Sequence, residues 1–396
     1  MGNTKFKVAY FQQDGSITGS AISLRHFLNV IDRNLFEPVV ILAKEGPARE
    51  LYESLDIKVM VFPFNTFWTF PGPGCFSRGM FRQLTALLPN KRLYQFITHQ
   101  VQPDLVHIND KAALNVGISL KGSKIPIVQH SRSSYVITKC AIGKYLSKEA
   151  IKQYANYIIS ISEDEEDGFE NFAHKSIIYN TVDLSLAEAA RSKKRETRAA
   201  LNVEDNEFLI GFAANVTEKK GAWDFLEICN KLKHLNNVKF IMVGEIAQSG
   251  QTYLSNGIVI QKTPLEYVKE YLKENNLQNK MMITGFRKDN LNLIAAMDVL
   301  VVPNKNGVLG RQPIEAQALG TTVVAQMGHS KKSNIILHEE TGFCINNINE
   351  AIQRITSIIE NNKHVAKKAI AHAEKNFNPS INIKAIENIY QKLLKS

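Results

Sequence analysis

What the sequence lacks counts against several classes of protein. Its 396 residues include only four cysteines, which are widely scattered and form no C-x-x-C pair, so neither a disulfide framework nor a zinc site is expected. No apolar run approaches the roughly 20 residues that a membrane-spanning helix needs. The amino terminus is not followed by a signal-peptide core, and no G-x-G-x-x-G follows a strand-like run, which counts against a nicotinamide or flavin dehydrogenase. We therefore expect a protein of the reducing cytoplasm.

Acidic residues are fewer than basic ones. The chain contains 38 Asp and Glu against 48 Lys and Arg, which gives a formal net charge of +10. A basic chain can bind nucleic acid, but an aromatic RNA-binding motif and a basic recognition helix are both missing, so no nucleic-acid partner is expected. An apolar content of 44% and a charged content of 22% are those of a globular protein. The length suggests two domains.

Strand-like and helix-like segments alternate in two successive series. In the first half the strand-like runs are FKVAYF, FEPVVILA, IKVMVF, PDLVHI, IPIVQH, YIISIS and SIIYN. After a charged stretch the alternation restarts with FLIGFAA, VKFIMVG, MMITG, DVLVVP, TTVVA and GFCI. Such alternation is typical of doubly wound parallel sheets. The predicted fold class is therefore α/β, with two Rossmann-like domains that meet near residues 184–200.

Two loops of the second half are suited to a diphosphate. The segment NKNGVLGRQPIEAQALGTTVVA, residues 304–325, reads as a loop after a strand, a helix that begins near Pro313, and another strand. A helix N-terminus at this edge of a parallel sheet favours phosphate, and Arg311 adds a cation. The earlier loop in GFAANVTEKKGAWDFLEI brings Lys220 to the same edge. Together the loops predict a diphosphate site, although either loop alone also fits a solvated cation at a helix start.

Motifs in a fixed order carry a family resemblance. In the second half they are GFAANVTEKKG, FIMVGE, MMITGFRKDNLNLIAAMDVLVVPN, GRQPIEAQALGTTVVA and HEETGF, and in the first half DGSITGSAISLRHFL, PDLVHIND, IPIVQHS and SIIYNTVD. In this order they resemble the GT-B glycosyltransferases, specifically the retaining family four of nucleotide-sugar-dependent enzymes, the group 1 type. The resemblance implies an acceptor domain (residues 1–185) and a donor domain (186–378) that face a central cleft. A C-terminal helix (379–396) would pack back on the first domain.

The resemblance also implies roles for individual residues. His130 would contact the donor sugar near its reacting carbon, Lys220 the diphosphate, and Glu315 the ribose hydroxyls. With Arg311, these three residues make up the expected catalytic group. The full set expected to bind the donor is Gly19, Asn215, Lys220, Gly285, Phe286, Arg287, Gly307, Leu309, Gly310, Arg311, Gln312 and Glu315. Within it, the segment 285–287 would surround the nucleobase, largely through backbone groups, and Gly19 would let the first loop approach the phosphate and the transferred sugar closely.

Two positions depart from the family pattern. The family places a glutamate eight residues before the ribose-binding one, where this chain has Gly307. An arginine is common five residues before the diphosphate lysine, where this chain has Asn215. We interpret Arg311 as a replacement for the missing cation. The missing carboxylate means that either the donor sugar is held differently or catalysis is weakened.

The implied reaction is sugar transfer with retained anomeric configuration from a nucleoside-diphosphate sugar, with a UDP-sugar favoured and a hexosyl or N-acetylhexosaminyl group transferred. No nucleophile stands out, so we expect the acceptor hydroxyl to attack on the face that the nucleoside diphosphate leaves. Lys220, Arg311 and helix amides would stabilise the departing charge. No D-x-D pair ends a strand, and no metal or other cofactor is expected. The acidic run EDEEDGFE, residues 163–170, is interpreted as a solvated helix start.

The acceptor domain carries a basic and aromatic segment, residues 62–96. No acidic residue occurs between Asp56 and Asp104, and within this interval Trp68, Arg78 and Arg82 are the residues expected to contact a membrane or acceptor. Basic residues among aromatics suit an anionic membrane surface. We expect a cytoplasmic enzyme at the inner face of the membrane, acting on a lipid-linked or surface-glycan acceptor. A core helix that follows an ordered loop is the alternative.

Two further functions remain open. A nucleotide-sugar epimerase of the same fold would use the same donor site but need acid and base residues and no acceptor. A catalytically weak subunit of the same fold, acting as a binding partner, is suggested by Gly307 and Asn215. Turnover of a nucleotide sugar, compared with binding of the nucleoside diphosphate alone, distinguishes these functions.

Overall fold

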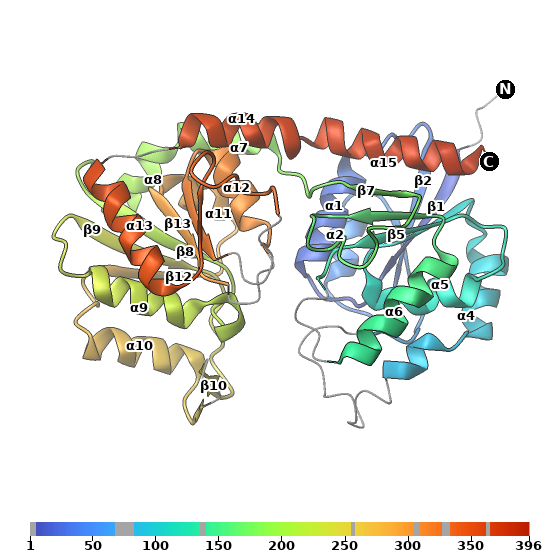
Figure 1. Cartoon of the computed structure of the whole chain (residues 1–396), viewed down its shortest axis with the longest axis horizontal. Helices are drawn as coiled ribbons and strands as arrows, with labels where there is room; N and C mark the ends of the chain where they lie inside the picture. The colour runs from blue at the N-terminus through green and yellow to red at the C-terminus, as the bar shows by residue number, and fades with distance from the viewer. Residues whose placement is uncertain are drawn as a thin grey trace. The chain divides into compact units, whose positions relative to one another are not determined.

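The chain divides into two compact units (Figure 1), Met1–Thr181 with Pro379–Ser396, and Val182–Asn378. The computed structural model describes residues 5–67, 83–134, 140–254, 258–304, 309–326, 333–361 and 365–395. Four residues singled out in the sequence lie outside these ranges: Trp68, Arg78, Arg82 and Gly307.

The first unit contains a parallel sheet of seven strands in the order β3-β2-β1-β4-β5-β6-β7. The strands are β1 (Phe6–Gln12), β2 (Phe36–Leu42), β3 (Lys58–Val61), β4 (Leu105–Ile108), β5 (Ile127–Ser131), β6 (Tyr157–Ser160) and β7 (Lys175–Ile177). The helices are α1 (Gly19–Val30), α2 (Ala48–Glu53), α4 (Lys91–Gln95), α5 (Leu114–Leu120), α6 (Ala141–Tyr154) and α15 (Pro379–Leu394). Both β4 and β5 are buried along their whole length, because helices cover both faces of the sheet.

The last helix, α15, packs in the apolar core of this first unit. Tyr390 meets the Phe36 ring edge-on, with centroids 5.6 Å apart, and Ile383 and Ile386 are buried in the same cluster. A backbone N–H at Asp32 donates to the Glu387 carboxylate of α15 at 2.8 Å. The carboxyl-terminal residues therefore complete the core that the amino-terminal strands begin.

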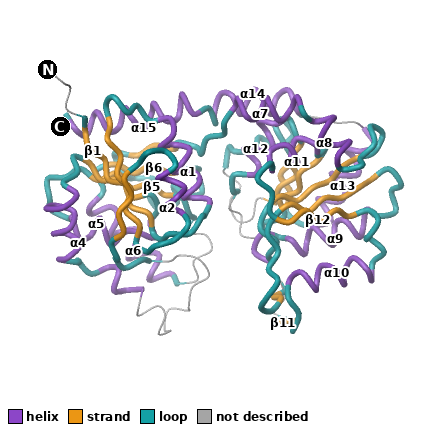
Figure 2. The backbone as a smooth tube through the Cα atoms, turned by 180° about the vertical axis from the view of Figure 1, so that it is seen from behind, coloured by secondary structure: helices purple, strands orange, loops and turns teal. Residues whose placement is uncertain are grey.

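The second unit contains a parallel sheet of six strands in the order β12-β9-β8-β13-β14-β15. Figure 2 draws the strands in orange and the helices around them in purple. The strands are β8 (Phe208–Ala213), β9 (Val238–Val243), β12 (Met281–Gly285), β13 (Val299–Val302), β14 (Thr322–Gln326) and β15 (Phe343–Ile345). The helices are α7 (Leu184–Ser192), α8 (Lys194–Ala200), α9 (Ala222–Leu232), α10 (Pro264–Glu274), α11 (Asn290–Ala296), α12 (Gln312–Leu319), α13 (Ile348–Asn361) and α14 (Ala366–Asn376). A short antiparallel pair, β10 (Thr252–Tyr253) with β11 (Val259–Ile260), precedes α10.

Both sheets reverse their strand order at their first strand. In the first unit β1 lies between β2 and β4, and in the second unit β8 lies between β9 and β13. In open α/β sheets, ligands bind at the carboxyl ends of the strands beside such a reversal. The order of the strands therefore directs attention to the loops after β1 and β4, and after β8 and β13.

The acidic run at residues 163–170 is not the solvated helix start that its charge indicates. The segment forms turns, and Asp164 and Glu165 are buried. The Glu165 carboxylate accepts a hydrogen bond from the Ser162 hydroxyl at 2.5 Å, while Lys144 and Lys148 pair with Asp167. Packing against the end of the sheet thus overrides the preference of acids for a helix N-terminus.

The segment at residues 62–96 contributes to the core more than the sequence suggests. Phe64 and Phe67 are buried, and Phe62 stacks on Phe96 with ring centroids 4.2 Å apart. Residues 85–101 form a 3-10 turn, the short helix α4 and a π-helical turn rather than one long amphipathic helix. The alternative of a core segment is therefore the correct one for these four aromatics.

Cys140 is disulfide-bonded, whereas the scattered spacing of the cysteines indicated no such bridge. Its partner lies outside the described residues. Cys229 and Cys344 are free thiols.

Candidate functional site

A small pocket lies at the strand reversal of the second unit. It is lined by Phe212, Ala213, Ala214, Lys220, Val301, Val302, Asn304 and Gln312. The ends of β8 and β13 form its floor, and the loop before α9 and the start of α12 supply Lys220 and Gln312. Two residues that the sequence assigned to the donor, Lys220 and Gln312, are therefore brought to one pocket.

The loop that carries Lys220 depends on a glycine. Gly221 has a φ of 78°, and a Cβ atom at this position would lie 2.0 Å from the carbonyl oxygen of Pro303. Only glycine allows the loop to approach the end of β13 this closely. Burial lowers the pKa of Lys220, and none of the described residues accepts a hydrogen bond from its ammonium group. A bound anion would compensate this cost of desolvation.

Helix α12 presents its amino end at the same edge of the sheet. Arg311 is its N-cap residue but makes no side-chain capping hydrogen bond, and Pro313 occupies the first turn. The helix ends at Gly320, which adopts a φ of 72°. An amino end without a side-chain cap, together with its dipole, favours a negatively charged ligand.

Arg311 and Glu315 form an ion pair across one turn of α12. The Nε atom of Arg311 donates to Oε1 of Glu315 at 3.2 Å, and the two side chains are only 13% and 12% exposed. The sequence assigned Arg311 to the phosphates and Glu315 to the ribose. In the structure the two groups lie together, so an effect of either residue on a ligand is coupled to the other.

The remaining residues assigned to the donor are also at or near the carboxyl ends of strands. Gly285 ends β12 with a φ of 68°, and Phe286 after it is 72% exposed. The Nε and Nη2 atoms of Arg287 both donate to Asp289 at 2.7 Å.

Asn215, just beyond β8, is exposed. At the start of α12, Leu309 is buried, and a Cβ at Gly310 would lie 2.5 Å from Oε1 of Gln312.

In the first unit, Gly19 begins α1 directly after the loop that follows β1. The N-cap residue Thr18 accepts a hydrogen bond from the Ala21 amide at 3.3 Å. A Cβ added at Gly19 would meet no described atom within 4 Å. The position is therefore open, as expected for a loop that a ligand approaches, but the packing alone does not demand glycine.

His130 lies near the end of β5 in a buried polar network. Its side chain is 2% exposed, and Nδ1 lies 3.2 Å from Nε2 of His107 in β4 and 3.3 Å from Nη2 of Arg132. The Tyr390 hydroxyl lies 2.6 Å from Nδ1 of His107. Burial, and then the charge of Arg132, lower the pKa of both histidines well below the ordinary value. Both imidazoles are therefore neutral near pH 7.

Sequence reasoning missed the partners of His130. His107 was visible as a polar residue within the apolar run PDLVHI, which is an unusual composition for a buried strand. Tyr390 follows His107 by 283 residues, and no local pattern connects the two positions.

A second buried group of charges follows β4 and β6. Lys111 is enclosed with Asp110 and Glu165, and it donates to the Ser133 carbonyl oxygen. Burial lowers the pKa of Lys111 to about 7 and raises the pKa values of both carboxyl groups. This group braces the ends of three neighbouring strands. Among the described residues, no cluster of three or more His, Cys, Asp or Glu side chains has the arrangement of a metal site.

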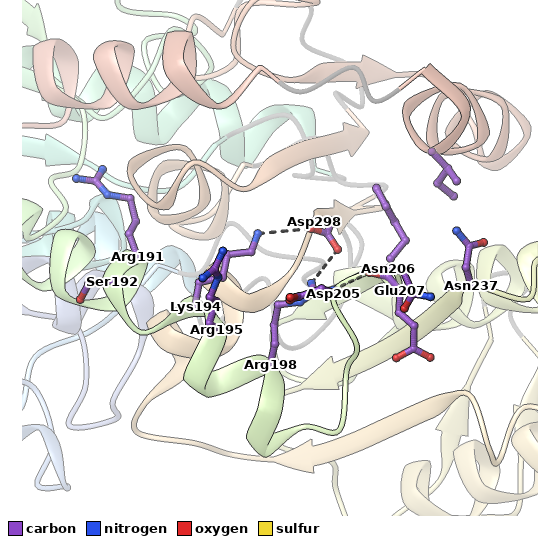
Figure 3. Close-up of a pocket in the computed structure, with 12 residues that line it drawn as sticks. Arg191, Ser192, Lys194, Arg195, Arg198, Asp205, Asn206, Glu207, Asn237 and Asp298 are labelled. Carbon is purple, nitrogen blue, oxygen red and sulfur yellow. Dashed lines mark hydrogen bonds and ion pairs between the residues drawn. The ribbon is translucent and has the colours of Figure 1, made fainter.

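A second pocket, of about 640 Å³, lies at the opposite edge of the second sheet (Figure 3). Its lining includes Glu207 and Asp298, which directly precede β8 and β13. Arg198 donates to Asp298 at 3.0 Å and to the backbone carbonyl oxygens of Ala296 and Glu207. Since ligands of such sheets bind at the carboxyl ends of strands, we interpret this pocket as a structural junction.

Comparison with known proteins agrees with this geometry. Residues 193–376 match the family model described as glycosyl transferases group 1. This part of the chain belongs to that family. Apart from Gly19 and His130, it contains every residue that the sequence analysis assigned to the donor, and it includes both the Lys220 loop and α12.

Curated relatives are similar at low identity. The chain is 26% identical to the O-antigen biosynthesis glycosyltransferase WclY of Escherichia coli over 244 residues, which are 60% of this chain and 61% of WclY. It is 22% identical to the UDP-Gal:alpha-D-GlcNAc-diphosphoundecaprenol alpha-1,3-galactosyltransferase of Escherichia coli over 375 residues, 90% and 89% of the two chains. The match thus spans about three fifths of WclY and most of the galactosyltransferase.

Solved structures show the fold. Anabaena Alr3699/HepE, in complex with UDP, aligns with a TM-score of 0.76 at 20% identity, covering 98% of this chain and 100% of the other. The predicted fold class is confirmed: the chain has two Rossmann-like units of the GT-B type. Among its described residues, no helix combines the length and apolar character needed to cross a membrane.

Proposed function

We propose that the protein is a glycosyltransferase that moves a hexosyl or N-acetylhexosaminyl group from a UDP-sugar to a lipid-linked or surface-glycan acceptor. The observation that carries the proposal is the pocket at the reversal between β8 and β13, with the largely buried cation Lys220 and the start of α12. Support comes from HepE, whose structure contains UDP, and from relatives named for O-antigen synthesis and for transfer to a diphosphoundecaprenol-linked sugar.

In this proposal the second unit binds the leaving group. The Lys220 ammonium and the amides at the start of α12 bind the diphosphate, and they stabilise the charge that grows as the glycosidic bond breaks. The acceptor hydroxyl then attacks on the same face, so the anomeric configuration is retained. These residues stabilise the charge without a metal ion.

The nucleoside is held beside the diphosphate. Because the Nε and Nη2 edge of Arg287 is engaged by Asp289, base recognition in this proposal rests on the backbone of Gly285 and on the exposed ring of Phe286, which can stack on uracil. Glu315 accepts hydrogen bonds from ribose hydroxyls through the oxygen that Arg311 leaves available.

A ligand screen tests the donor assignment. UDP and a panel of UDP- and GDP-sugars should be compared by thermal shift, because a ligand that binds only the folded state raises the melting temperature. UDP should stabilise the wild type, and it should fail to stabilise Lys220→Met. Lys219→Met, changed at the exposed neighbour on the same turn, is the matched control and should respond as the wild type does. Equal responses of both variants to UDP would contradict the assigned role of Lys220.

The acceptor side is proposed to lie on an anionic membrane surface. Trp68, Arg78 and Arg82 remain the residues assigned by sequence. In the described part of the first unit, the first turns of α6 expose the apolar side chains of Ile142 (59%) and Tyr145 (64%), and exposed apolar side chains of this kind suit a membrane surface. The enzyme would thus act from the cytoplasmic face on lipid-linked acceptors.

Sedimentation with liposomes tests this proposal. Binding to vesicles that contain phosphatidylglycerol should fall as salt rises, and Ile142→Ser with Tyr145→Ser should weaken it while the response to UDP is unchanged. Leu186→Ser, at an apolar residue exposed on the second unit, is the control. Failure of the wild type to sediment at low salt, with efficient transfer to a soluble acceptor, would contradict membrane docking.

A catalytically weak binding subunit is the second candidate. It is favoured by the exposed Asn215, which stands where the family commonly has an arginine. UDP binding without turnover of any nucleotide sugar would select this candidate, and release of UDP from a donor would exclude it.

A further inference from the structure

A chain of three hydrogen bonds runs from the last helix through His107 and His130 to Arg132. The Tyr390 hydroxyl on α15 lies 2.6 Å from Nδ1 of His107, and Nε2 of His107 lies 3.2 Å from Nδ1 of His130. Nη2 of Arg132 lies 3.3 Å from the same Nδ1 atom of His130. Every member of this chain belongs to the first unit.

Arg132 sets the direction of the whole chain. A guanidinium group can only donate hydrogen bonds, so Nδ1 of His130 must carry a lone pair. The partner Nε2 of His107 must then carry a proton, and in a neutral imidazole Nδ1 of His107 is left as an acceptor. The Tyr390 hydroxyl therefore donates. The reverse direction would place two N–H groups against each other at His130.

The orientation of Arg132 is itself fixed by two amide oxygens. Its Nε donates to Oδ1 of Asn109 at 2.7 Å, and its Nη1 donates to Oδ1 of Asn180 at 2.7 Å. Asn109 in turn donates from Nδ2 to Oε1 of Gln12 at 2.6 Å. The guanidinium group therefore cannot turn away from His130 without breaking two short hydrogen bonds.

The environment keeps His130 neutral. The titratable groups that face the pair of imidazoles are Arg132, Tyr390 and Tyr10, whose ring lies 5.3 Å from that of His107. Burial and the positive charge of Arg132 lower the pKa values of both histidines. A neutral His130 with a bare Nδ1 has its proton on Nε2.

That Nε2 atom is buried and has no hydrogen-bond partner among the described residues. A buried N–H without an acceptor is unfavourable, and it is usually completed by a ligand or by water. Since Nε2 already carries its proton, His130 cannot act there as a general base. It can act only as a hydrogen-bond donor.

We propose that Tyr390, His107 and Arg132 are positioning residues that hold His130 in the Nε2–H tautomer, so that it donates a hydrogen bond to an oxygen of the sugar substrate. The inference rests on the proposed glycosyltransferase function. It assigns a role to α15 that packing alone does not require, because Tyr390→Phe would preserve the aromatic contacts and remove only the donor.

The tautomer can be measured without any substrate. In protein labelled with ¹⁵N-histidine, long-range proton–nitrogen spectra should show the Nε2–H form for both His107 and His130, with signals assigned from the His107→Gln and His130→Gln variants. In Tyr390→Phe, His107 loses the donor at its Nδ1, so the Nδ1 signal of His107 should shift, whereas His130 should keep the Nε2–H form because Arg132 still donates to its Nδ1. A wild-type His130 with its proton on Nδ1, or charged at pH 7, would overturn the proposal.

Kinetic measurements distinguish whether His130 acts as a hydrogen-bond donor or as a general base. A glutamine side chain can place its amide nitrogen near the position of Nε2, so His130→Gln should lose about 10-fold in kcat, whereas His130→Ala should lose about 10²- to 10³-fold. The pH profile of His130→Gln should keep the wild-type shape between pH 6 and 9. Equal losses in the two variants, or loss of a basic limb in the glutamine variant alone, would overturn the donor role.

Tyr390→Phe should lower kcat about 3- to 10-fold, the effect of one hydrogen bond, with little change in KM for the donor. Tyr157→Phe is the matched control, since it removes a hydroxyl that bonds Ser176 in the same sheet, outside the chain. Wild-type kcat in Tyr390→Phe would overturn the positioning role. If the wild type turns over no nucleotide sugar, the proposed function fails, whereas the tautomer measurement still decides the assignment of His130.

Discussion

Nε of Arg311 donates to Oε1 of Glu315 at 3.2 Å, one turn apart at the start of α12. Gln312, the residue after Arg311, lines the same pocket as Lys220. Because a diphosphate is negatively charged, a carboxylate in the same site is tolerated only if a cation neutralises it. Arg311 can therefore assist binding in two ways. Its positive charge attracts the phosphates, and it neutralises the Glu315 carboxylate, which accepts hydrogen bonds from the ribose.

This relationship predicts strong coupling between the two residues. Arg311→Ala should weaken UDP binding about 10-fold, because it leaves a largely buried carboxylate without a counter-ion near the phosphates. Glu315→Gln should weaken UDP binding less. It removes one hydrogen-bond acceptor for the ribose, but it leaves no carboxylate without a counter-ion near the phosphates. In the double variant the loss should be smaller than the sum, by at least about 0.5 kcal/mol. Isothermal titration with UDP measures all four proteins, and additive losses would contradict the coupling.

The shifted pKa of Lys220 predicts opposite effects on stability and on turnover. The ammonium is charged in the unfolded chain up to the ordinary lysine pKa of 10.5, but burial lowers its pKa in the folded state. Between these two pKa values the unfolded chain binds more protons than the folded state, so the free energy of unfolding rises with pH. Below both pKa values the folded state bears the full free-energy cost of burying the charged ammonium group. Lys220→Met should therefore raise the melting temperature at pH 7 while lowering kcat about 10²-fold.

Differential scanning fluorimetry from pH 7 to pH 11 checks the first part of this prediction. The advantage of Lys220→Met over the wild type should shrink as pH rises through the lowered pKa of the lysine. Lys219→Met, at the exposed neighbouring lysine, is the control for this comparison. A variant that is less stable than the wild type at pH 7 would mean that the ammonium has a favourable partner in the free protein.

The order of elements was predictable from the sequence, because each buried strand of a parallel sheet is a short apolar run with polar residues around it. Runs such as FLIGFAA and DVLVVP gave β8 and β13, and the loops after them gave the positions of Lys220 and α12. Which charged side chains are buried was not predictable in the same way. Glu165 and Lys111 are buried because strands that are distant in sequence end side by side. The local sequence does not indicate which strand ends will be neighbours.

The same limit applies to His130. Its place at a strand end and its resemblance to a family position were visible, but its tautomer follows from the contacts of Arg132 and His107, and the last member of the chain, Tyr390, enters the first unit only through the packing of α15. The ion pair of Arg311 with Glu315 is a contrasting case. Its spacing of four residues on a helix is a local pattern that could have been recognised from the sequence.

The junction shown in Figure 3 predicts a change in stability without a change in binding. Asp298 accepts from Arg198 at 3.0 Å and from the Leu209 amide at 2.8 Å, and the Arg198 side chain is buried. Asp298→Asn should lower the free energy of unfolding by about 3 kcal/mol, because it leaves a buried guanidinium without its counter-ion. Urea unfolding measures the loss, and UDP affinity at a temperature where the variant is folded should stay at the wild-type value. A selective loss of UDP affinity would place a ligand at this pocket instead.

Two glycines with similar backbone conformations allow a test of the Lys220 loop. Gly221 and Gly250 have φ values of 78° and 87°, but a Cβ at Gly221 would lie 2.0 Å from the Pro303 carbonyl oxygen, while a Cβ at Gly250 would have no neighbour within 4 Å. Gly250→Ala should therefore cost only the backbone strain, about 1–2 kcal/mol. Gly221→Ala carries the same strain and must also push the loop away from β13.

We expect Gly221→Ala to lose both stability and UDP binding, because displacement of the loop moves Lys220 out of the pocket that it shares with Gln312. Urea unfolding should show a loss of about 3 kcal/mol or more, and thermal shift should show little response to UDP. Gly250→Ala should keep the full UDP response after correction for its own melting temperature. If the two variants lose the same stability and retain the same affinity, the close approach of Gly221 to Pro303 does not position Lys220.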